Sequence, residues 1–158
     1  IDADGLNNLD NELKKLLSLR HVLTPHPGEM ARLTGKSIED VLRDPAGFAE
    51  NTAKAFGCIV LLKGAVSVAA HPDGRLRYNA SGNPGLAKGG SGDVLTGIIT
   101  ALLAQGLEPF DAASAGAYIL GSSAESALEL LHERALTAGD VLDAIEKTAG
   151  ITEHRNLF

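Results

Sequence analysis

Hydrophobic positions follow a helical period in some stretches of the chain and form short unbroken runs in others. A helical period over residues 8–20 places four leucines on one face, and a second helix is predicted over Pro45–Phe56. Residues 21–24 (HVLT) form a short apolar run that ends at Pro25, which predicts a strand. Residues 58–62 (CIVLL) contain no charged or strongly polar side chain, as is typical of a strand covered on both faces of its sheet.

Two shorter helices are predicted between these elements. Residues 28–35 (GEMARLTG) predict one or two helical turns that end at Gly35, because glycine readily adopts the left-handed conformation just beyond a helix. Ser37 and Asp40 have the spacing of a capping box at the start of the next helix. Strands and helices therefore alternate in the first part of the chain.

The second half of the chain adds a hairpin and three helices. The stretches VSVAA and RLRYN flank residues 71–74 (HPDG), a typical turn between antiparallel strands. Helices are predicted over 94–105, over Phe110–His132, and from Thr137 onward, where Asp140 follows at capping-box spacing. The alternation of strands and helices indicates the α/β class, and the hairpin makes the predicted sheet mixed.

Composition narrows the possible classes of protein. The 158 residues are 44% hydrophobic, which fits one domain with a substantial core. The net charge of -6 and the sequence pI of about 5.3 argue against a nucleic-acid partner, because such proteins neutralise phosphates with a basic surface. Cys58 is the single cysteine, and no run approaches the roughly 18 apolar residues of a membrane span. We therefore expect a cytoplasmic protein without a membrane segment.

The densest sequence signal is the stretch SGNPGLAKGGSGDVLTG, residues 81–97, which holds six glycines directly before a predicted helix. Glycine lets backbone amides approach a ligand closely, and a helix N-terminus adds unpaired N–H groups and the positive end of a dipole. The stretch lacks both the P-loop and the dinucleotide-binding spacing. It predicts an anion site of another type, with a flexible turn as the alternative interpretation.

Asp93 follows these glycines in the first predicted helical turn. A carboxylate beside a phosphate is repulsive unless it accepts a proton from a substrate hydroxyl during phosphoryl transfer. We therefore predict that Asp93 is a general base, and that Gly89, Gly90 and Gly92 donate backbone hydrogen bonds to the transferred group. The alternative is that Asp93 only stabilises the helix dipole.

The turn after the buried strand, residues 63–67 (KGAVS), is a second candidate. Ligands of open α/β sheets gather beyond the carboxyl ends of the strands. Lys63 is placed there to hold a phosphate, and Gly64 allows close approach of the backbone. Without further support, a solvated turn lysine explains the same pattern.

Four motifs, in the same order along the chain, resemble one known family. They are DADGLNNL (2–9), LTPHPGEMARLTG (23–35), LLKGAVSV (61–68) and GNPGLAKGGSGDVLTGIITALLAQG (82–106). Together they resemble the ADP/ATP-dependent NAD(P)H-hydrate dehydratases, members of the ribokinase-like superfamily. The resemblance implies a three-layer α/β/α fold with a mostly parallel sheet and a β-hairpin.

The resemblance also implies an activity, namely repair of hydrated NADH or NADPH. Phosphoryl transfer from ADP or ATP to the hydrate hydroxyl would be followed by loss of phosphate. His26 and Asp93 would contact the hydrated substrate. The nucleotide would be bound by Lys63, Gly64, Ala65, Val66, Ser67 and Gly92.

Magnesium is implied as a cofactor. Glu29 resembles the carboxylate with which the superfamily holds Mg²⁺ through water, but it equally suits the first turn of a helix as a dipole partner. Asp2 and Asp4 either act on Mg²⁺ through water or form a turn. Lys88 stands where the family often has a small polar residue, and either contacts phosphate or points to solvent.

Full members of the resembled family have a sizeable region before the DAD motif. We therefore interpret residues 1–158 as the C-terminal portion of a single domain, and expect an open sheet edge that favours a homo-oligomer or a partner. Two alternative functions stay open. One is a ribokinase-like kinase for a sugar or vitamin precursor, and the other is a nucleotide-binding fragment without activity.

Overall fold

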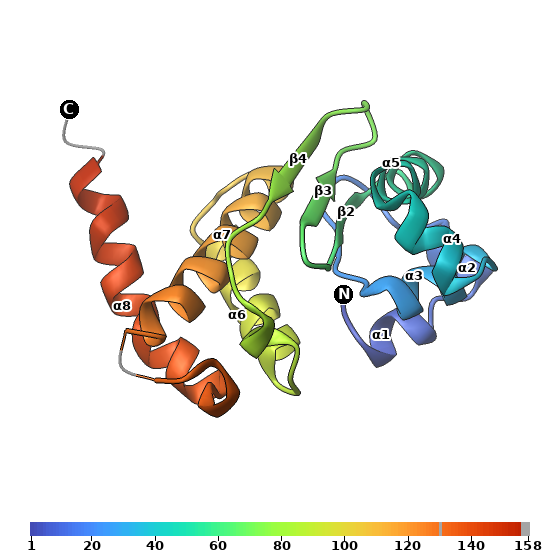
Figure 1. Cartoon of the computed structure of the whole chain (residues 1–158). Coiled ribbons are helices and arrows are strands. Elements are labelled where there is room, and N and C mark those ends of the chain that lie inside the picture. Colours follow the sequence, from blue (N-terminus) through green and yellow to red (C-terminus); the bar gives the residue numbers. More distant parts are fainter. Residues whose placement is uncertain (130, 156–158) are drawn as a thin grey trace.

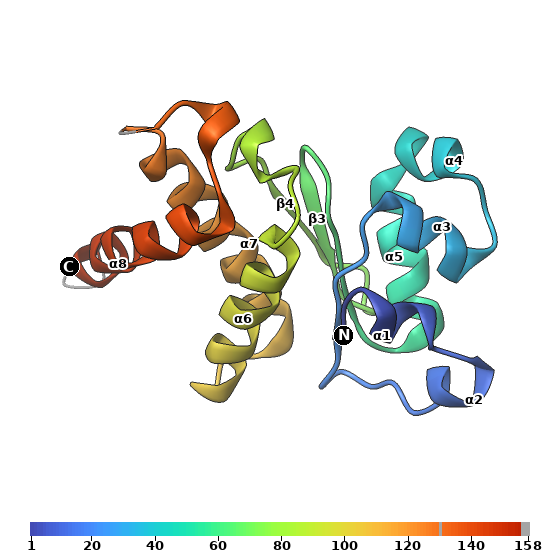
Figure 2. The same ribbon diagram turned by 90° about the horizontal axis from the view of Figure 1, so that it is seen from below.

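The computed structural model describes residues 1–129 and 131–155, and within the last helix it describes side chains as far as residue 148. A central sheet lies between two layers of helices (Figures 1 and 2). The first half of the chain forms the layer on one face, and the second half forms the layer on the other. The α/β class and the three-layer arrangement follow the prediction.

The sheet has the order β1-β2-β3-β4, with bounds Val22–Leu23, Ile59–Leu62, Ser67–Ala70 and Leu76–Asn79. The β1–β2 pair is parallel, and the other two pairs are antiparallel. Among the strands of the described residues, one pair is therefore parallel and two pairs are antiparallel. The backbone nitrogen of Ile1, an ammonium group, donates to the Val22 carbonyl, and the Thr24 amide donates to the Ile1 carbonyl, which extends the sheet beyond β1 with parallel-type bonds.

Helices on the two faces come from the two halves of the chain. The first layer contains α1 (Asp4–Asn7), α2 (Asn11–Lys14), α3 (Pro27–Thr34), α4 (Ile38–Arg43) and α5 (Pro45–Phe56). The second contains α6 (Ser91–Ala104), α7 (Pro109–Ala127) and α8 (Ala138–Arg155), with 3₁₀ turns η1 (Pro84–Leu86) and η2 (Glu133–Ala135). The bounds of α5, the hairpin and the Ser37 cap of α4 agree with the predictions.

Strand β2 connects two hydrophobic cores. Ile59 and Leu61 pack into the core under α6 and α7, whereas Val60 and Leu62 pack into the core under α3 and α5. Successive side chains of a strand point to opposite faces, so a strand that is buried on both faces needs apolar residues at every position. Burial on both faces explains why apolar and polar residues do not alternate in the CIVLL stretch.

The helix predicted over 8–20 was wrong. The helix that forms there, α2, is a single turn, and the Asp10 side chain caps it by accepting from the amides of Glu12 and Leu13. Leu13 and Leu16 are 45% and 72% exposed, whereas Leu9 and Leu17 pack against the core under α3 and α5, so the four leucines do not form one buried helical face. Amphipathic spacing alone does not form a helix without tertiary burial.

One further prediction needs correction, at the end of α7. The helix predicted to reach His132 ends at Ala127, and His132 instead caps η2 by accepting from the Arg134 amide. The first described residue of α8 is Ala138, and Thr137 and Asp140 exchange the predicted capping hydrogen bonds.

In the part of the chain that the structure describes, no helix has the length and apolarity needed to cross a membrane.

Helix α7 packs closely against the segment that follows β4. A Cβ atom at Gly121 would overlap Ser81, because the Ser81 carbonyl carbon and oxygen would both lie 2.6 Å from it. The Asn79 side-chain amide also donates to the Ala117 carbonyl of α7 at 3.2 Å. Small residues in α7 therefore set the path of the chain that leads from the hairpin to the glycine-rich stretch.

We predict that Gly121→Ala lowers the free energy of unfolding by about 1–3 kcal/mol, because the added methyl group must displace the backbone at Ser81. The matched control is Gly97→Ala in α6, where no atom lies within 4 Å of the new methyl group. That control is expected to be neutral or to stabilise the helix by up to about 1 kcal/mol. Urea denaturation measures both, and equal midpoints for the two variants would contradict the packing argument.

Candidate functional site

A cavity of about 740 Å³ brings together segments that are far apart in the sequence. Its walls are the turn at residues 63–67, the glycine loop (residues 81–92), Asn79 at the end of β4, and one face of α7. The lining residues are His26, Lys63, Gly64, Ala65, Ser67, Asn79, Ser81, Gly82, Asn83, Pro84, Leu86, Ala87, Lys88, Gly89, Ser91, Gly92, Leu95, Ala117, Leu120 and Gly121. The two predicted ligand-binding segments therefore face one cavity.

The N-terminal end of α6, its mouth, lies at the glycine loop. Gly90 precedes the helix with a φ of 93°, a left-handed conformation that favours glycine, and no side chain caps the helix there. Within the described part of the chain, the amides of residues 89–93 donate no hydrogen bond. Unpaired N–H groups at a helix N-terminus bind anions, so this mouth has the chemistry of a phosphate site.

Asp93 is exposed in the first turn of α6, and it lies outside the residues that line the cavity. Two more predicted residues are also absent from that lining, namely Gly90 and Val66, and the Val66 side chain is 47% exposed. The cavity therefore contains most of the predicted nucleotide-binding residues but not the predicted general base. The role of Asp93 stays a prediction.

Lys63 lies between two carboxylates at the end of β2. Its Nζ is 2.7 Å from Asp2 Oδ1 and 3.9 Å from Glu29 Oε2. The Lys63 amide donates to the Pro25 carbonyl at 2.8 Å, which fixes the end of β2 beside the end of β1. A solvated turn lysine is therefore not what forms here, since the Lys63 side chain is only 22% exposed.

The ion pair of Asp2 and Lys63 lies directly against the mouth of α6. A Cβ at Gly92 would lie 3.2 Å from Asp2 Oδ2 and 3.6 Å from Lys63 Nζ. The hydroxyl of Thr96, one turn along α6, donates to Asp2 Oδ2 at 3.3 Å. Asp2 thus joins the start of the chain, the turn at 63–67 and α6, which explains why its side chain is only 12% exposed.

The pKa of the Asp2 carboxyl is below its ordinary value. Burial on its own would raise this pKa, but the hydrogen bond and positive charge of Lys63, helped by a hydrogen bond from Thr24, outweigh the effect of burial. The carboxylate is therefore held in its charged form. Asp2 acts as a structural partner of Lys63 rather than only as a turn former.

His26 and Glu29 form a capping box at the start of α3. His26 Nδ1 accepts from the amides of Gly28 and Glu29 at 3.0 and 3.3 Å, and the His26 amide donates to Glu29 Oε2 at 2.8 Å. Glu29 therefore has the helix-start role that the sequence offered as one of its two interpretations. Among the described residues no group of three His, Cys, Asp or Glu side chains is placed to hold a metal ion.

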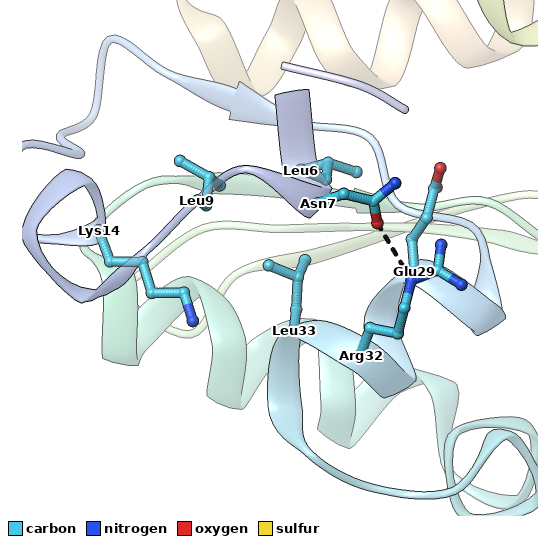
Figure 3. Close-up of a pocket in the computed structure, with 7 residues that line it drawn as sticks. All are labelled: Leu6, Asn7, Leu9, Lys14, Glu29, Arg32 and Leu33. Atoms are coloured by element: carbon cyan, nitrogen blue, oxygen red, sulfur yellow. Dashed lines mark hydrogen bonds between the residues drawn. The ribbon is translucent and has the colours of Figure 1, made fainter. Parts of the chain in front are cut away.

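A second, smaller cavity of about 340 Å³ lies between the first three helices. Its lining residues are Leu6, Asn7, Leu9, Lys14, Glu29, Arg32 and Leu33. Figure 3 shows Glu29 extending its carboxylate away from Lys14 and Leu33, while Arg32 Nε donates to Asn7 Oδ1 at 3.1 Å. The carboxylate of Glu29 lies beside His26 and Lys63, with Oε1 3.5 Å from His26 Nε2 and Oε2 3.9 Å from Lys63 Nζ.

Sequence reasoning missed two features of the large cavity. The wall formed by α7 was not predicted. Lys88 was expected at a phosphate or in solvent, but its ammonium donates to the carbonyls of Arg134 and Leu136 at 2.7 and 2.8 Å. Both features depend on contacts between residues more than 30 positions apart, which local patterns do not reveal.

Known proteins resemble the chain over nearly its whole length. The family model of NAD(P)H-hydrate dehydratase matches residues 1–147. A bifunctional NAD(P)H-hydrate repair enzyme of Moorella thermoacetica is 47% identical over 145 residues, which cover 90% of this chain and 27% of that protein. The chain therefore spans only part of the length of such a relative.

Solved structures also resemble the chain in fold. The ADP/ATP-dependent NAD(P)H-hydrate dehydratase of Bacillus subtilis, co-crystallized with ATP and Mg²⁺, superposes with a TM-score of 0.77 at 36% identity and covers 80% of this chain and 46% of its own. A ribokinase-like superfamily protein of Enterococcus faecalis has a TM-score of 0.75 at 26% identity, over 94% of this chain and 50% of its own. The ribokinase-like fold is thereby confirmed.

The Asp2–Lys63 pair makes a prediction about pH. Because the Asp2 pKa is lower in the folded chain than in the unfolded chain, its contribution is complete above the unfolded value of about 3.9 and is lost as pH falls through the folded value. Asp2→Asn is expected to lower the free energy of unfolding at pH 7 by about 1–3 kcal/mol. The gap from the wild type should close as the pH is lowered.

The matched control is Asp4→Asn, which alters an exposed carboxylate two residues away and is expected to change stability by less than about 0.5 kcal/mol. Urea titrations at several pH values measure all three proteins. A wild-type advantage over Asp2→Asn that is independent of pH would contradict the assignment.

Proposed function

The chain belongs to the NAD(P)H-hydrate dehydratase family, and from this premise we propose that it binds ADP or ATP and provides the phosphoryl-transfer part of a site that dehydrates hydrated NADH or NADPH. One observation carries the proposal. The turn at 63–67 and the glycine loop, which are separate in sequence, line the same cavity beside the unpaired amides of α6. We treat residues 1–158 as the C-terminal portion of one such domain.

The proposed chemistry solves a leaving-group problem. The hydroxyl of the hydrate is a poor leaving group, so its oxygen first takes the terminal phosphoryl group and the nucleotide leaves with one phosphate fewer. The carbon–oxygen bond then breaks with its electron pair on the departing phosphate. Loss of a proton from the adjacent carbon forms the double bond and restores the reduced nicotinamide.

The predicted residues divide the tasks of this scheme. Asp93 accepts the hydroxyl proton, and the amides of Gly89, Gly90 and Gly92 stabilise the charge on the transferred group. His26 contacts the hydrated substrate. The nucleotide lies against the turn that contains Lys63, Gly64, Ala65, Val66 and Ser67, with Gly92 opposite.

Mg²⁺ would accompany the phosphates of the nucleotide, and it would mask part of their charge. Glu29 does not fit as a direct ligand, because its Oε2 accepts from the His26 amide and faces Lys63. Mg²⁺ keeps much of its hydration shell in proteins, so contact with Glu29 or Asp2 would pass through water. No step of the scheme depends on a direct bond between the ion and this chain.

Analysis of the reaction products can also reveal either of two other functions. A ribokinase-like kinase would use the same glycine loop and general base, but it would leave a stable phosphorylated product. A nucleotide-binding chain without turnover would bind ADP or ATP and release no product. Product analysis separates the three possibilities.

The proposed location is the cytoplasm, where cysteine stays reduced. Cys58 is buried in the core under α3 and α5. Burial raises the pKa of its thiol to about 12, so the reactive thiolate does not form near neutral pH. The proposed partners are small-molecule nucleotides rather than nucleic acid, because the chain carries a net charge of -6.

We predict that Asp93→Asn abolishes dehydration but not nucleotide binding. In a parent protein that turns over the hydrate, loss of the base should lower kcat by about 10²–10⁴-fold. The dissociation constant for ADP, measured by calorimetry, should change little because Asp93 lies outside the cavity. Recovery of reduced-nicotinamide absorbance measures kcat.

The matched control is Asp143→Asn, an exposed aspartate on α8, which should leave kcat unchanged. Near-normal turnover by Asp93→Asn would refute the base assignment. Absence of any ADP-induced rise in Tm for the wild-type chain would refute the binding site itself, because a ligand of the folded state must stabilise it.

We also propose that copies of the chain associate through the surface around β1 and α2. This surface exposes Ile1, Leu13, Leu16 and Leu19, whose exposed fractions range from 40% to 72%. Exposed large apolar side chains are candidates for burial against another chain. Light scattering after gel filtration should give a mass of at least two chains, and a stable monodisperse monomer would contradict the proposal.

A further inference from the structure

We propose that Lys88 is a positioning residue that fastens the glycine loop to the wall formed by residues 133–138, and so maintains the affinity for a nucleoside diphosphate. The link to affinity rests on the function proposed above. The fastening itself rests on contacts in the structure.

Lys88 makes two long-range hydrogen bonds. Its Nζ donates to the Arg134 carbonyl at 2.7 Å and to the Leu136 carbonyl at 2.8 Å, across 46 and 48 residues of sequence. An ammonium group has three donors and no acceptor, so two of the three are engaged by this wall. Hydrogen bonds from a charged donor are stronger than neutral ones, which suits a fastening role.

The glycine loop touches the same wall on both sides of Lys88. A Cβ at Gly85 would lie 2.9 Å from both the Glu133 carbonyl oxygen and the Leu136 side chain. A Cβ at Gly90 would lie 3.0 Å from the Ala138 methyl group. Glycine at these positions permits the approach, and Lys88 supplies the polar attachment between them.

The wall is anchored independently of the loop. Leu136 is 1% exposed and packs into the core under α6 and α7. Thr137 and Asp140 then fix the start of α8, with the Thr137 amide and hydroxyl donating to Asp140 Oδ2 at 2.8 and 2.6 Å. A segment held in this way gives Lys88 a fixed point to bind.

Fastening matters because the loop is costly to order. Glycine loses more backbone freedom on folding than any other residue, and the amides of residues 89–93 have no partner in the described part of the chain. A ligand that had to order these amides itself would bind more weakly. Lys88 keeps the donors arranged before the ligand arrives.

The deciding experiment compares Lys88→Met with Lys88→Arg in the ligand-free protein. Methionine keeps the length of the side chain but removes its donors, whereas arginine keeps charge and donors. Hydrogen exchange is followed at the amides of Gly85, Leu86 and Ala87, which are hydrogen-bonded within the loop. Calorimetry with ADP is run on the same samples, and Lys36→Met, at an exposed lysine outside the cavity, is the control.

We expect Lys88→Met to speed exchange at the three loop amides about tenfold and to weaken ADP binding by a similar factor, about 1.4 kcal/mol. Exchange in β2 should not change, which separates a local release of the loop from general destabilisation. Lys88→Arg should keep loop exchange and ADP affinity close to their wild-type values. Lys36→Met should change neither.

Two results overturn the proposal. Unchanged exchange in ligand-free Lys88→Met, with weaker ADP binding, would make Lys88 a direct phosphate ligand instead. Faster exchange with unchanged ADP affinity would remove the link to binding. A wild-type chain that does not bind ADP would refute the proposed function, and the exchange data would still decide whether Lys88 fastens the loop.

Discussion

The ion pair between Asp2 and Lys63 is the contact on which the candidate site depends. It joins residues 61 positions apart, and Thr96 binds the same carboxylate from 94 positions away. The start of the chain, the end of β2 and the first turns of α6 therefore meet at one carboxylate. Because Gly92 has no side chain, α6 can approach this pair closely enough for its amides to face the turn at 63–67. The cavity exists because these segments are drawn together.

The same contact changes how the site would bind a phosphate. Lys63 is an obvious cation for that purpose, but Asp2 and Glu29 already balance its charge at 2.7 and 3.9 Å. Lys88 directs two of its donors to backbone carbonyls. The unpaired amides at the mouth of α6 are therefore the donors that remain for an anion, and they would let a chain with a net charge of -6 bind a phosphate without a cluster of free lysines.

What the sequence predicted well is local in origin. Helix α5 has the predicted bounds because Pro45 suits its first turn, the Asp44 side chain caps it, and Gly57 ends it with a φ of 63°. The glycine loop and the turn at 63–67 were likewise recognisable from short motifs, and most of their predicted residues line one cavity. The helix over 8–20 failed because only Leu9 and Leu17 pack against the core, while Leu13 and Leu16 stay exposed. The α7 wall and the two acceptors of Lys88 lay beyond prediction, since they require knowledge of which distant segments face each other.

The exposed position of Asp93 is compatible with the proposed in-line phosphoryl transfer. Entering and departing oxygens lie on opposite sides of the transferred phosphoryl group, so donor and acceptor must approach the helix mouth from different directions. Gly92 faces the cavity, where the donor nucleotide would lie, while the next residue, Asp93, turns outward from it. The acceptor hydroxyl would therefore reach the phosphoryl group from the exposed side, and whatever covers that side, another copy or a different polypeptide segment, would complete the acceptor pocket. On this arrangement, the proposed roles would place the nucleotide donor and the base in the described chain, and affinity for the nucleotide would not require a complete acceptor pocket.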